Sequence, residues 1–322
     1  MIRIIIVYWV KVMELSISLT KQIMAMFIMI LVGFILIKKK ICRIDDSKML
    51  SAIVLYVAAP CAIINSFLIK CTPEKMKGFI LAIVAAIIVH IIYIMLTYIL
   101  GKFFHFNTIE KASIIYSNCG NLILPLVQIV LGQEMVFYAS GYMIVQTILL
   151  WTHCKFMISK DKSFDLKKIL FNINILSILI GIILFFIQVS LPVPVTSAMN
   201  SMSNLMGPLS MFVIGMLLAK MDLKAVFRKK RVYFICFFRL IVLPLVILFI
   251  FVYSGIDHIA PNGTSILLIS LLAASAPSAS TVTQFAQIYD NNPGGASVIN
   301  AMSVILCVVT MPLMIMIYNM LI

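Results

Sequence analysis

The chain has 322 residues, of which 63% are hydrophobic and 11% are charged, and its formal net charge is +14. This composition lies far outside the range of soluble globular domains and predicts an integral membrane protein. The basic residues stand in short runs between apolar segments, so they indicate membrane orientation and argue against a nucleic-acid partner. The seven cysteines are scattered and show no metal-binding spacing, so we expect no metal and no other cofactor.

Apolar segments recur along the whole chain at the length a helix needs to cross a membrane, about 20 residues for a hydrocarbon layer of about 30 Å. They predict an all-α protein with ten transmembrane helices, spans 1 to 10, at residues 17–37, 49–69, 78–100, 112–131, 135–153, 170–189, 201–219, 232–253, 264–289 and 296–319. The apolar run within residues 1–12 is too short to span and lacks the cleavage site of a secretory signal. We therefore interpret 1–12 as an N-terminal extension, with Met13 as an alternative start.

Lysine and arginine are concentrated in the loops after the odd-numbered spans, for example 38–48 and 220–231. Because cytoplasmic loops carry the excess of basic residues, we expect these loops in the cytoplasm. The prediction is a multi-pass protein of the cytoplasmic (inner) membrane with both termini outside.

The two halves of the chain share a spacing. The distance in sequence from Gly33 to Pro60 recurs from Gly181 to Pro208, and the prolines of spans 4 and 9 follow at similar distances. The predicted units are a first five-helix repeat at 13–156, a cytoplasmic loop at 157–169 and a second five-helix repeat at 170–322. Because each repeat has an odd number of spans, the second must enter the membrane from the opposite side, which makes the repeats inverted.

Spans 4 and 9 carry prolines where a membrane helix should be continuous. Span 4 contains Asn118, Gly120, Asn121 and Pro125, and span 9 contains Pro277 among small hydroxylated residues. A proline frees backbone carbonyl groups, which in a membrane need partners in the protein or in a water-filled cavity. We therefore expect two broken helices that cross in mid-membrane, where half-helix N-termini suit a small carboxylate. For either span alone, a packed proline kink is the alternative.

Motifs in several spans follow one order along the chain. They read GFILIKKK in span 1, YVAAPCAIINS in span 2, NCGNLILPL in span 4, YASGYMIVQTILLW in span 5 and APSASTVTQFAQIYDNNPGGASVINAMSVILCVVTMPL across spans 9 and 10. From about Met13 to the C-terminus the chain resembles the auxin efflux carrier family, which includes plant auxin exporters and bacterial malate and malonate permeases.

The resemblance implies the fold of bile-acid/sodium symporters. In that fold spans 1, 2, 6 and 7 form a scaffold, spans 3–5 and 8–10 form a moving transport domain, and the substrate binds where spans 4 and 9 cross. By motif position Asn118, Pro125 and Pro277 carry over to this site. The chain departs from the family pattern at Ile123, where glycine is usual, and at Thr281, where bacterial members often have asparagine, so the substrate does not carry over.

Other polar residues near the crossing complete the candidate site. The predicted substrate-binding residues are Asn118, Gly120, Asn121, Pro125, Gln146, Arg239, Pro277, Ser278, Ser280 and Thr281. We interpret Arg239 as compensating an anionic substrate or supporting a crossover carbonyl, with snorkelling to the nearby basic loop as the alternative. Gln146 either lines the site or bonds a neighbouring helix, and His90 is either a proton relay or a neutral imidazole bonded to a neighbouring helix.

No aspartate or glutamate lies deep in any span, which argues against tight coupling to protons or sodium. We therefore expect a secondary transporter that exports or facilitates diffusion of a small organic anion by an elevator-type, alternating-access mechanism. A sodium- or proton-coupled organic acid symporter is the alternative, since crossover carbonyls and hydroxyls could hold sodium. An intramembrane enzyme is remote, because the spans show no nucleophile with its base and no metal site. The expected partners are the anion and the lipid bilayer, and a homodimer is left open.

Overall fold

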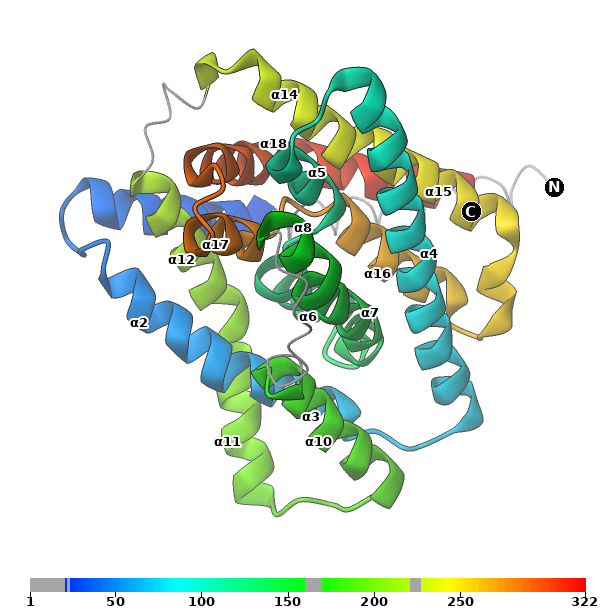
Figure 1. Ribbon diagram of the computed structural model, residues 1–322. Coiled ribbons are helices and arrows are strands. Elements are labelled where there is room, and N and C mark those ends of the chain that lie inside the picture. Colours follow the sequence, from blue (N-terminus) through cyan, green and yellow to red (C-terminus); the bar gives the residue numbers. More distant parts are fainter. Residues whose placement is uncertain (1–20, 22–23, 160–169, 221–226) are drawn as a thin grey trace, which may run out of the picture.

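The computed structural model describes residue 21 and residues 24–159, 170–220 and 227–322, and these residues are almost entirely helical (Figure 1). Their only β-type pairing is one isolated bridge. The predicted N-terminal extension 1–12 and most of the predicted loop 157–169 lie outside the described residues.

The helices follow one another with short connections in both halves. The first half contains the helix Met24–Lys38, α2 (Asp46–Ile53), α3 (Ala59–Phe67), α4 (Pro73–Phe104), α5 (Thr108–Ile115), α6 (Leu124–Leu131), α7 (Met135–Leu149) and α8 (Lys155–Ser159). The second half contains α10 (Ile173–Ile187), α11 (Val193–Asn204), α12 (Met206–Lys220), α14 (Lys230–Phe237), α15 (Leu243–Ser254), α16 (Gly263–Ser275), α17 (Ser280–Ile288) and α18 (Pro293–Leu321). Wider π-helical turns are η1 (Val54–Ala58), η2 (Cys119–Ile123), η3 (Leu150–Cys154) and η4 (Phe238–Val242), and η5 (Ile256–Ile259) is a 3-10 turn.

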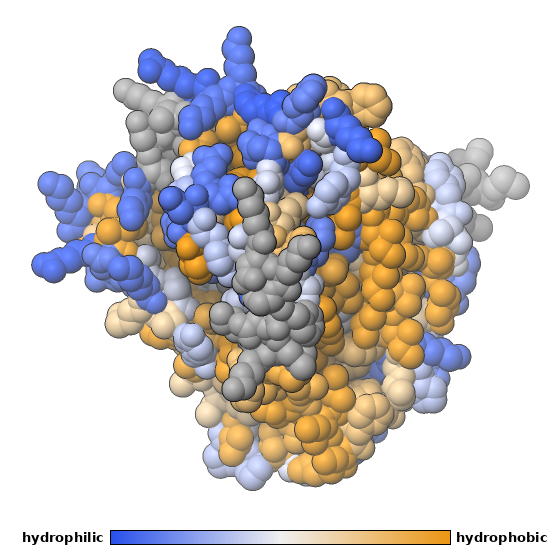
Figure 2. All heavy atoms as spheres, in the orientation of Figure 1, coloured by the Kyte–Doolittle hydropathy of each residue, from blue (hydrophilic) through white to orange (hydrophobic). Residues whose placement is uncertain are grey.

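Among the described residues, 6 helical runs are long and apolar enough to cross a membrane: Asp46–Phe67, Pro73–Phe104, Met135–Ser159, Val193–Lys220, Lys230–Ser254 and Pro293–Leu321. The shorter apolar helices are Met24–Lys38, Ile173–Ile187 and Gly263–Ser275. Figure 2 shows apolar side chains over the right and lower parts of one face and hydrophilic side chains along its top and left. The prediction of an all-helical, multi-pass membrane protein is confirmed.

Three of the prolines in the helices follow π-helical turns. Pro60, Pro125 and Pro244 each stand two residues after the end of such a turn, at η1, η2 and η4. An extra residue in the turn relieves the clash between the proline ring and the preceding carbonyl groups. The spans around Pro60 and Pro244 therefore remain continuous helical runs.

One set of helices, here called the four-span group, consists of Met24–Lys38, α2–α3, α10 and α11–α12. Within it α3 packs on α10 and α11, and α2 packs on α12. The close approaches are made at glycines: a Cβ on Gly33 would overlap the backbone of Phe212, and one on Gly181 would lie 2.5 Å from the ring of Phe67. The helix Met24–Lys38 thus packs on α12 and α10 packs on α3, an exchange between the two halves.

The remaining helices, α4 to α8 and α14 to α18, form the six-span group. Here α4 packs on α7 and α16, and α18 packs on α14, α16 and α17. In Figure 1 the α3–α10–α11 cluster lies at the bottom of the view, while α4, α14, α15 and α16 lie above and to the right. The two groups meet where α12 contacts α6 and η2 and where α3 contacts α7.

Candidate functional site

Two helices of the six-span group are interrupted inside the protein. α5 ends at Ile115 and helical structure resumes only at Cys119, while α16 ends at Ser275 and α17 begins at Ser280. The backbone is extended on each break: Tyr116 has φ −100° and ψ 130°, and Ala279 has φ −62° and ψ 133°. Pro277 lies within the second break, whereas Pro125 lies beyond the first one, in the first turn of α6.

The two breaks cross as short antiparallel strands. Ser117 and Ser278 form the bridge. The N–H of Asn118 donates to the carbonyl of Pro277 at 2.8 Å, and the N–H of Ala279 donates to the carbonyl of Tyr116 at 2.9 Å. Backbone groups released by one helix are therefore satisfied by the other, which makes irregular backbone tolerable inside a membrane protein.

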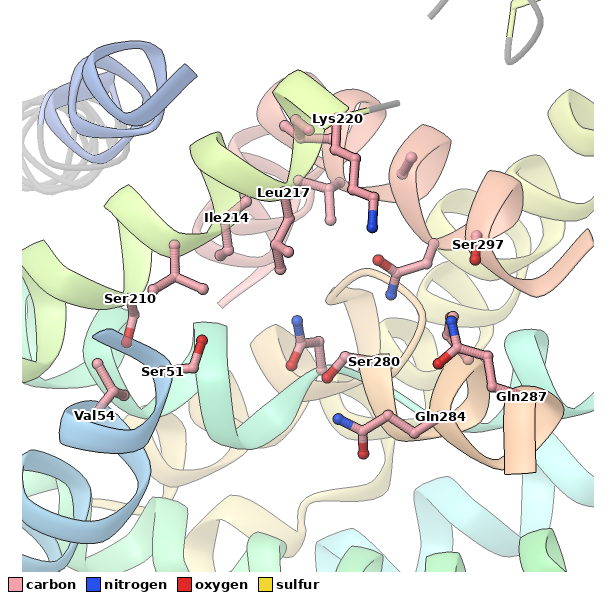
Figure 3. A pocket seen from close by; sticks show the side chains of 17 residues that line it. Ser51, Val54, Ser210, Ile214, Leu217, Lys220, Ser280, Gln284, Gln287 and Ser297 are labelled. Carbon is pink, nitrogen blue, oxygen red and sulfur yellow. The ribbon is translucent and has the colours of Figure 1, made fainter. Parts of the chain in front are cut away.

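A cavity of about 470 Å³ lies beside this crossing, between α12 of the four-span group and α17 and α18 of the six-span group (Figure 3). Its polar and charged lining residues are Ser51, Asn118, Ser210, Lys220, Ser280, Thr283, Gln284, Gln287, Ser297 and Asn300. Its apolar lining residues are Val54, Val213, Ile214, Leu217, Leu218, Ala301 and Val304. The volume and the mixture of an apolar wall with a few polar groups are those of a small-molecule site.

The charge of the cavity has one sign. Lys220, at the C-terminal end of α12, is the only charged residue among the described residues that line it. Figure 3 shows the side-chain nitrogen of Lys220 pointing into the open space. The N-terminal end of α17, at Ser280, adds the positive end of a helix dipole. Together these features favour a negatively charged solute.

Two hydroxyl groups on opposite walls are left without partners. The Oγ of Ser210 and the Oγ1 of Thr283 are buried and form no hydrogen bond with the described residues. A buried hydroxyl without a partner costs free energy, and a polar solute between the walls could supply that partner.

The predicted site residues divide into two sets. Asn118 and Ser280 line the cavity. Gly120, Pro125, Gln146, Arg239, Pro277, Ser278 and Thr281 do not line it, and the side chain of Asn121 lies outside what the structure describes.

Several residues of the second set hold the crossing together. Gln146 is buried, and its Nε2 donates to the carbonyl of Ser117 at 2.7 Å, so it forms an interhelical hydrogen bond. The N–H of Ser278 donates to the Oγ of Ser303 at 3.0 Å, and the Nδ2 of Asn300 donates to the carbonyl of Ser278 at 2.6 Å.

Arg239 and His90, the ionisable residues that the sequence places deep inside spans, do not line the cavity. Arg239 is 1% exposed, and its guanidinium donates to the carbonyls of Ala276 at 3.0 Å and Ile114 at 2.9 Å. It therefore supports crossover carbonyls; it neither snorkels to the loop nor faces the cavity. The Nδ1 of His90 lies 2.7 Å from the carbonyl of Ala86, a partner on its own helix and not on a neighbour as expected.

Sequence reasoning missed the side chains that reach the cavity from outside the breaks, namely Ser51, Ser210, Lys220, Gln284, Gln287, Ser297 and Asn300. Lys220 is the first basic residue of the loop 220–231, and in the sequence this position indicated only the orientation of the chain in the membrane. Its place on the cavity depends on how α12 lies across from α17, which no local pattern reports.

Comparison with known proteins gives one family. No curated protein matches the chain. The model of the family described as membrane transport protein matches residues 18–168 and 162–315, one segment for each half of the chain. With nearly the whole chain matched in two repeated halves, this protein belongs to the membrane transport protein family, which is the auxin efflux carrier family.

Proposed function

We propose that this protein is a secondary transporter that moves a small organic anion across the cytoplasmic membrane by alternating access. The observation that carries the proposal is the cavity beside the crossing of two broken helices, whose only charged lining residue among those described is Lys220. Broken helices near the bilayer midplane are where secondary transporters bind substrate. Since the family is one of membrane transport proteins, an enzymatic function is excluded.

The proposed topology has ten spans in two inverted repeats. The broken helices Thr108–Leu131 and Gly263–Ile288 would be spans 4 and 9, and the remaining apolar helices supply the other eight. The basic segments 38–43 and 229–231 are exposed and lie after spans 1 and 7. Because basic loops stay in the cytoplasm, this side would be cytoplasmic and both termini would be outside.

The cavity opens toward the proposed cytoplasmic side. Ser51 lies near the start of span 2, Lys220 at the end of span 7 and Gln287 at the end of span 9, all next to the odd-numbered loops. The described conformation would therefore be inward-facing.

The opposite end of the interface is closed by polar contacts between the two groups of helices, here called the glutamine contact. The Nε2 of Gln128 donates to the Oγ of Ser203 at 2.8 Å, and the Nε2 of Gln133 donates to the carbonyl of Ala62 at 2.7 Å. Gln128 and Gln133 belong to the six-span group, and the other two residues belong to the four-span group. We propose that the four-span group is the scaffold and that the six-span group slides against it as an elevator, breaking this contact and carrying the solute outward.

The membrane potential suffices to drive the proposed export. Moving one negative charge out of an inside-negative cell yields about 2.3 kcal/mol per 100 mV, which corresponds to roughly fifty-fold accumulation outside. No carboxylate lines the cavity among the described residues, so the site holds no acidic group that would bind a coupling proton.

The test is solute flux in proteoliposomes of the purified full-length protein. A panel of radiolabelled mono- and dicarboxylates and an indole acid is measured with imposed voltage, sodium and proton gradients. We expect at least one anion to cross the membrane faster than in protein-free liposomes. Reversing the sign of the imposed voltage should reverse the direction of its net flux. Flux equal to that of protein-free liposomes for every solute would reject the proposal.

A further inference from the structure

The backbone carbonyl groups of the two breaks raise a separate question. In secondary transporters, unwound carbonyls and the C-terminal ends of half-helices are the groups that bind a coupling Na⁺. Such an ion needs several oxygen atoms that converge on it, and a carbonyl that already accepts a hydrogen bond has only one lone pair left for a cation. The hydrogen bonds at this crossing show whether its oxygens are open to a cation.

The two breaks contain seven backbone carbonyls, at residues 116–118 and 276–279, and backbone N–H groups donate to four of them. The carbonyls of Pro277 and Tyr116 accept from the paired break, as described above. The carbonyl of Asn118 accepts from the N–H of Leu122 at 3.2 Å, and that of Ala279 accepts from the N–H of Val282 at 3.1 Å.

Side chains occupy the other three. Gln146 donates to the carbonyl of Ser117 at 2.7 Å, Asn300 donates to that of Ser278 at 2.6 Å, and Arg239 donates to that of Ala276 at 3.0 Å. Every carbonyl from 116 to 118 and from 276 to 279 therefore accepts a hydrogen bond from the protein.

Arg239 stands between the C-terminal ends of the two first half-helices. Its Nη1 donates to Ile114, in the last turn of α5, and its Nε donates to Ala276, directly after α16. Both ends carry the negative pole of a helix dipole, so two negative poles converge on one guanidinium. The same guanidinium lies 5.4 Å from the centre of the Tyr93 ring, and the hydroxyl of Tyr93 donates to the carbonyl of Ala274 at 3.0 Å.

No aspartate or glutamate forms an ion pair with Arg239 among the described residues. A buried cation without a counter-ion is unfavourable unless dipoles and hydrogen bonds compensate it. Here the compensation comes from the carbonyl ends of α5 and α16 and from the Tyr93 ring, while the Nη2 of Arg239 has no hydrogen-bond partner among the described residues. A planar, weakly hydrated guanidinium suits such a position better than an ammonium group does.

We infer that Arg239 is the resident cation of the crossing: it takes the position in which a bound Na⁺ would neutralise the two carbonyl ends, so the breaks keep their geometry without an added ion. Arg239 is thus a positioning residue that holds the half-helices against which the solute binds. If the protein transports an anion as proposed, this role of Arg239 has one consequence: transport needs no Na⁺. That consequence rests on the proposed function.

The first test uses Na⁺ itself as the probe and needs no substrate. Thermal unfolding of the purified full-length protein in detergent is compared in NaCl and in choline chloride at equal ionic strength. We expect the wild type to show no Na⁺-specific shift of its unfolding temperature. A saturable increase with Na⁺ in the wild type would overturn the inference.

Variants separate a cation role from ordinary packing. Arg239→Ala removes the resident charge and is expected to gain a Na⁺-specific rise of the unfolding temperature. The matched control is Arg231→Ala combined with Glu110→Gln, because Arg231 lies in the same span, donates to the carbonyls of Phe104 and His105 and pairs with the buried carboxylate of Glu110, which the second change neutralises. We expect it to lose stability with no response to Na⁺. If Arg239→Ala keeps wild-type stability in choline, or folds less stably with no Na⁺ response, the inference is wrong.

A flux arm distinguishes this inference from the proposed function. Radiolabelled malate or, failing that, malonate is measured in wild-type proteoliposomes with Na⁺ or choline on both sides, and equal rates are expected. Flux that requires Na⁺ would overturn the inference while leaving the transport function intact. Arg239→Lys, which keeps the charge, should retain flux in choline, whereas Arg239→Ala should lose about tenfold or more there. If Arg239→Ala does not fold, the wild-type comparisons decide.

Discussion

Lys220 supplies the only charge on the cavity wall among the residues described. We expect Lys220→Gln to raise the KM for a transported carboxylate roughly tenfold or more, because a hydrogen bond to a charged group contributes about 1.5–3 kcal/mol. Flux of an uncharged analogue should change little, and Lys220→Arg should retain most of the wild-type rate. The measurement is concentration-dependent flux in proteoliposomes.

Lys230→Gln is the matched control for this prediction. Lys230 begins α14, is exposed and does not line the cavity. Its loss changes the net charge equally but should leave the KM unchanged. Equal effects at Lys220 and Lys230 would indicate a general surface-potential effect and remove Lys220 from the binding site.

Asn118 contributes to the crossing and to the cavity through different atoms. Its backbone N–H pairs with Pro277, while its side chain lines the cavity. We therefore expect Asn118→Ala to keep the wild-type unfolding temperature within a few degrees and to lower flux about tenfold. Normal flux in this variant, with normal insertion, would show that the solute passes elsewhere.

The chemistry of single residues was predictable only where it depends on local backbone. Asn118 and Ser280, which line the cavity, were singled out because prolines, small residues and, for Asn118, the family motif mark the breaks. Gln146 and Arg239 are polar and buried, and the sequence could not distinguish contact with a solute from contact with a carbonyl. The structure decides between these roles because only atomic positions show which acceptor each donor reaches.

The helices of the four-span group depend on glycine for their close packing. Gly33→Ala would place a methyl group against the backbone of Phe212, which cannot move aside as a flexible side chain can. We expect a loss of about 1–3 kcal/mol of unfolding free energy, measured as a lower midpoint in thermal or denaturant unfolding. Gly294→Ala is the control, because its Cβ would have no atom within 4 Å, and a similar loss there would contradict the packing argument.

The glutamine contact closes the side of the helix interface opposite the cavity. Gln133→Ala removes the donor to the carbonyl of Ala62 and should favour the conformation in which this side opens. In a chain whose Cys61 and Cys71 are replaced by serine, we expect a membrane-impermeant thiol reagent applied outside to label Ile129→Cys roughly five- to tenfold faster when Gln133 is replaced, because Ile129 faces Gly207 across the interface. Gln188→Ala is the control, since Gln188 donates to the carbonyls of Ile69 and Phe185 within the four-span group. Unchanged labelling with Gln133→Ala would show that this contact does not hold the interface closed.

Element boundaries and breaks were predicted with unequal success. Pro125 and Pro277 indicated the interrupted helices, yet Pro60 and Pro244 stand in continuous spans. The difference is not in the proline itself, because a π-helical turn also precedes Pro60 and Pro244 and their helical runs stay continuous. A span opens only where a second extended segment supplies the missing hydrogen bonds, as Pro277 and Ala279 do for Asn118 and Tyr116.

The class of the whole molecule follows from composition and helix length, and the repeated halves were visible as matched glycine and proline spacings. The cavity was not visible in this way. Its walls come from α12 and α17, which are far apart along the chain. α12 belongs to the four-span group and α17 to the six-span group, so the two helices have different packing partners. Gly33 and Gly181, which the spacing matches, each make a close contact with a helix of the opposite half.

We propose that a small organic anion occupies the cavity beside the crossing during transport. The most direct measurement is substrate protection of a cysteine placed there, in a chain whose partly exposed Cys42, Cys61 and Cys71 are replaced by serine. Ser297→Cys lines the cavity, and Gly294→Cys, at the exposed start of the same helix, is the control. We predict that a charged thiol reagent blocks flux through Ser297→Cys only, and that a transported carboxylate slows this labelling while leaving Gly294→Cys unaffected. Labelling of Ser297→Cys that continues at its full rate when the carboxylate saturates transport would contradict the account.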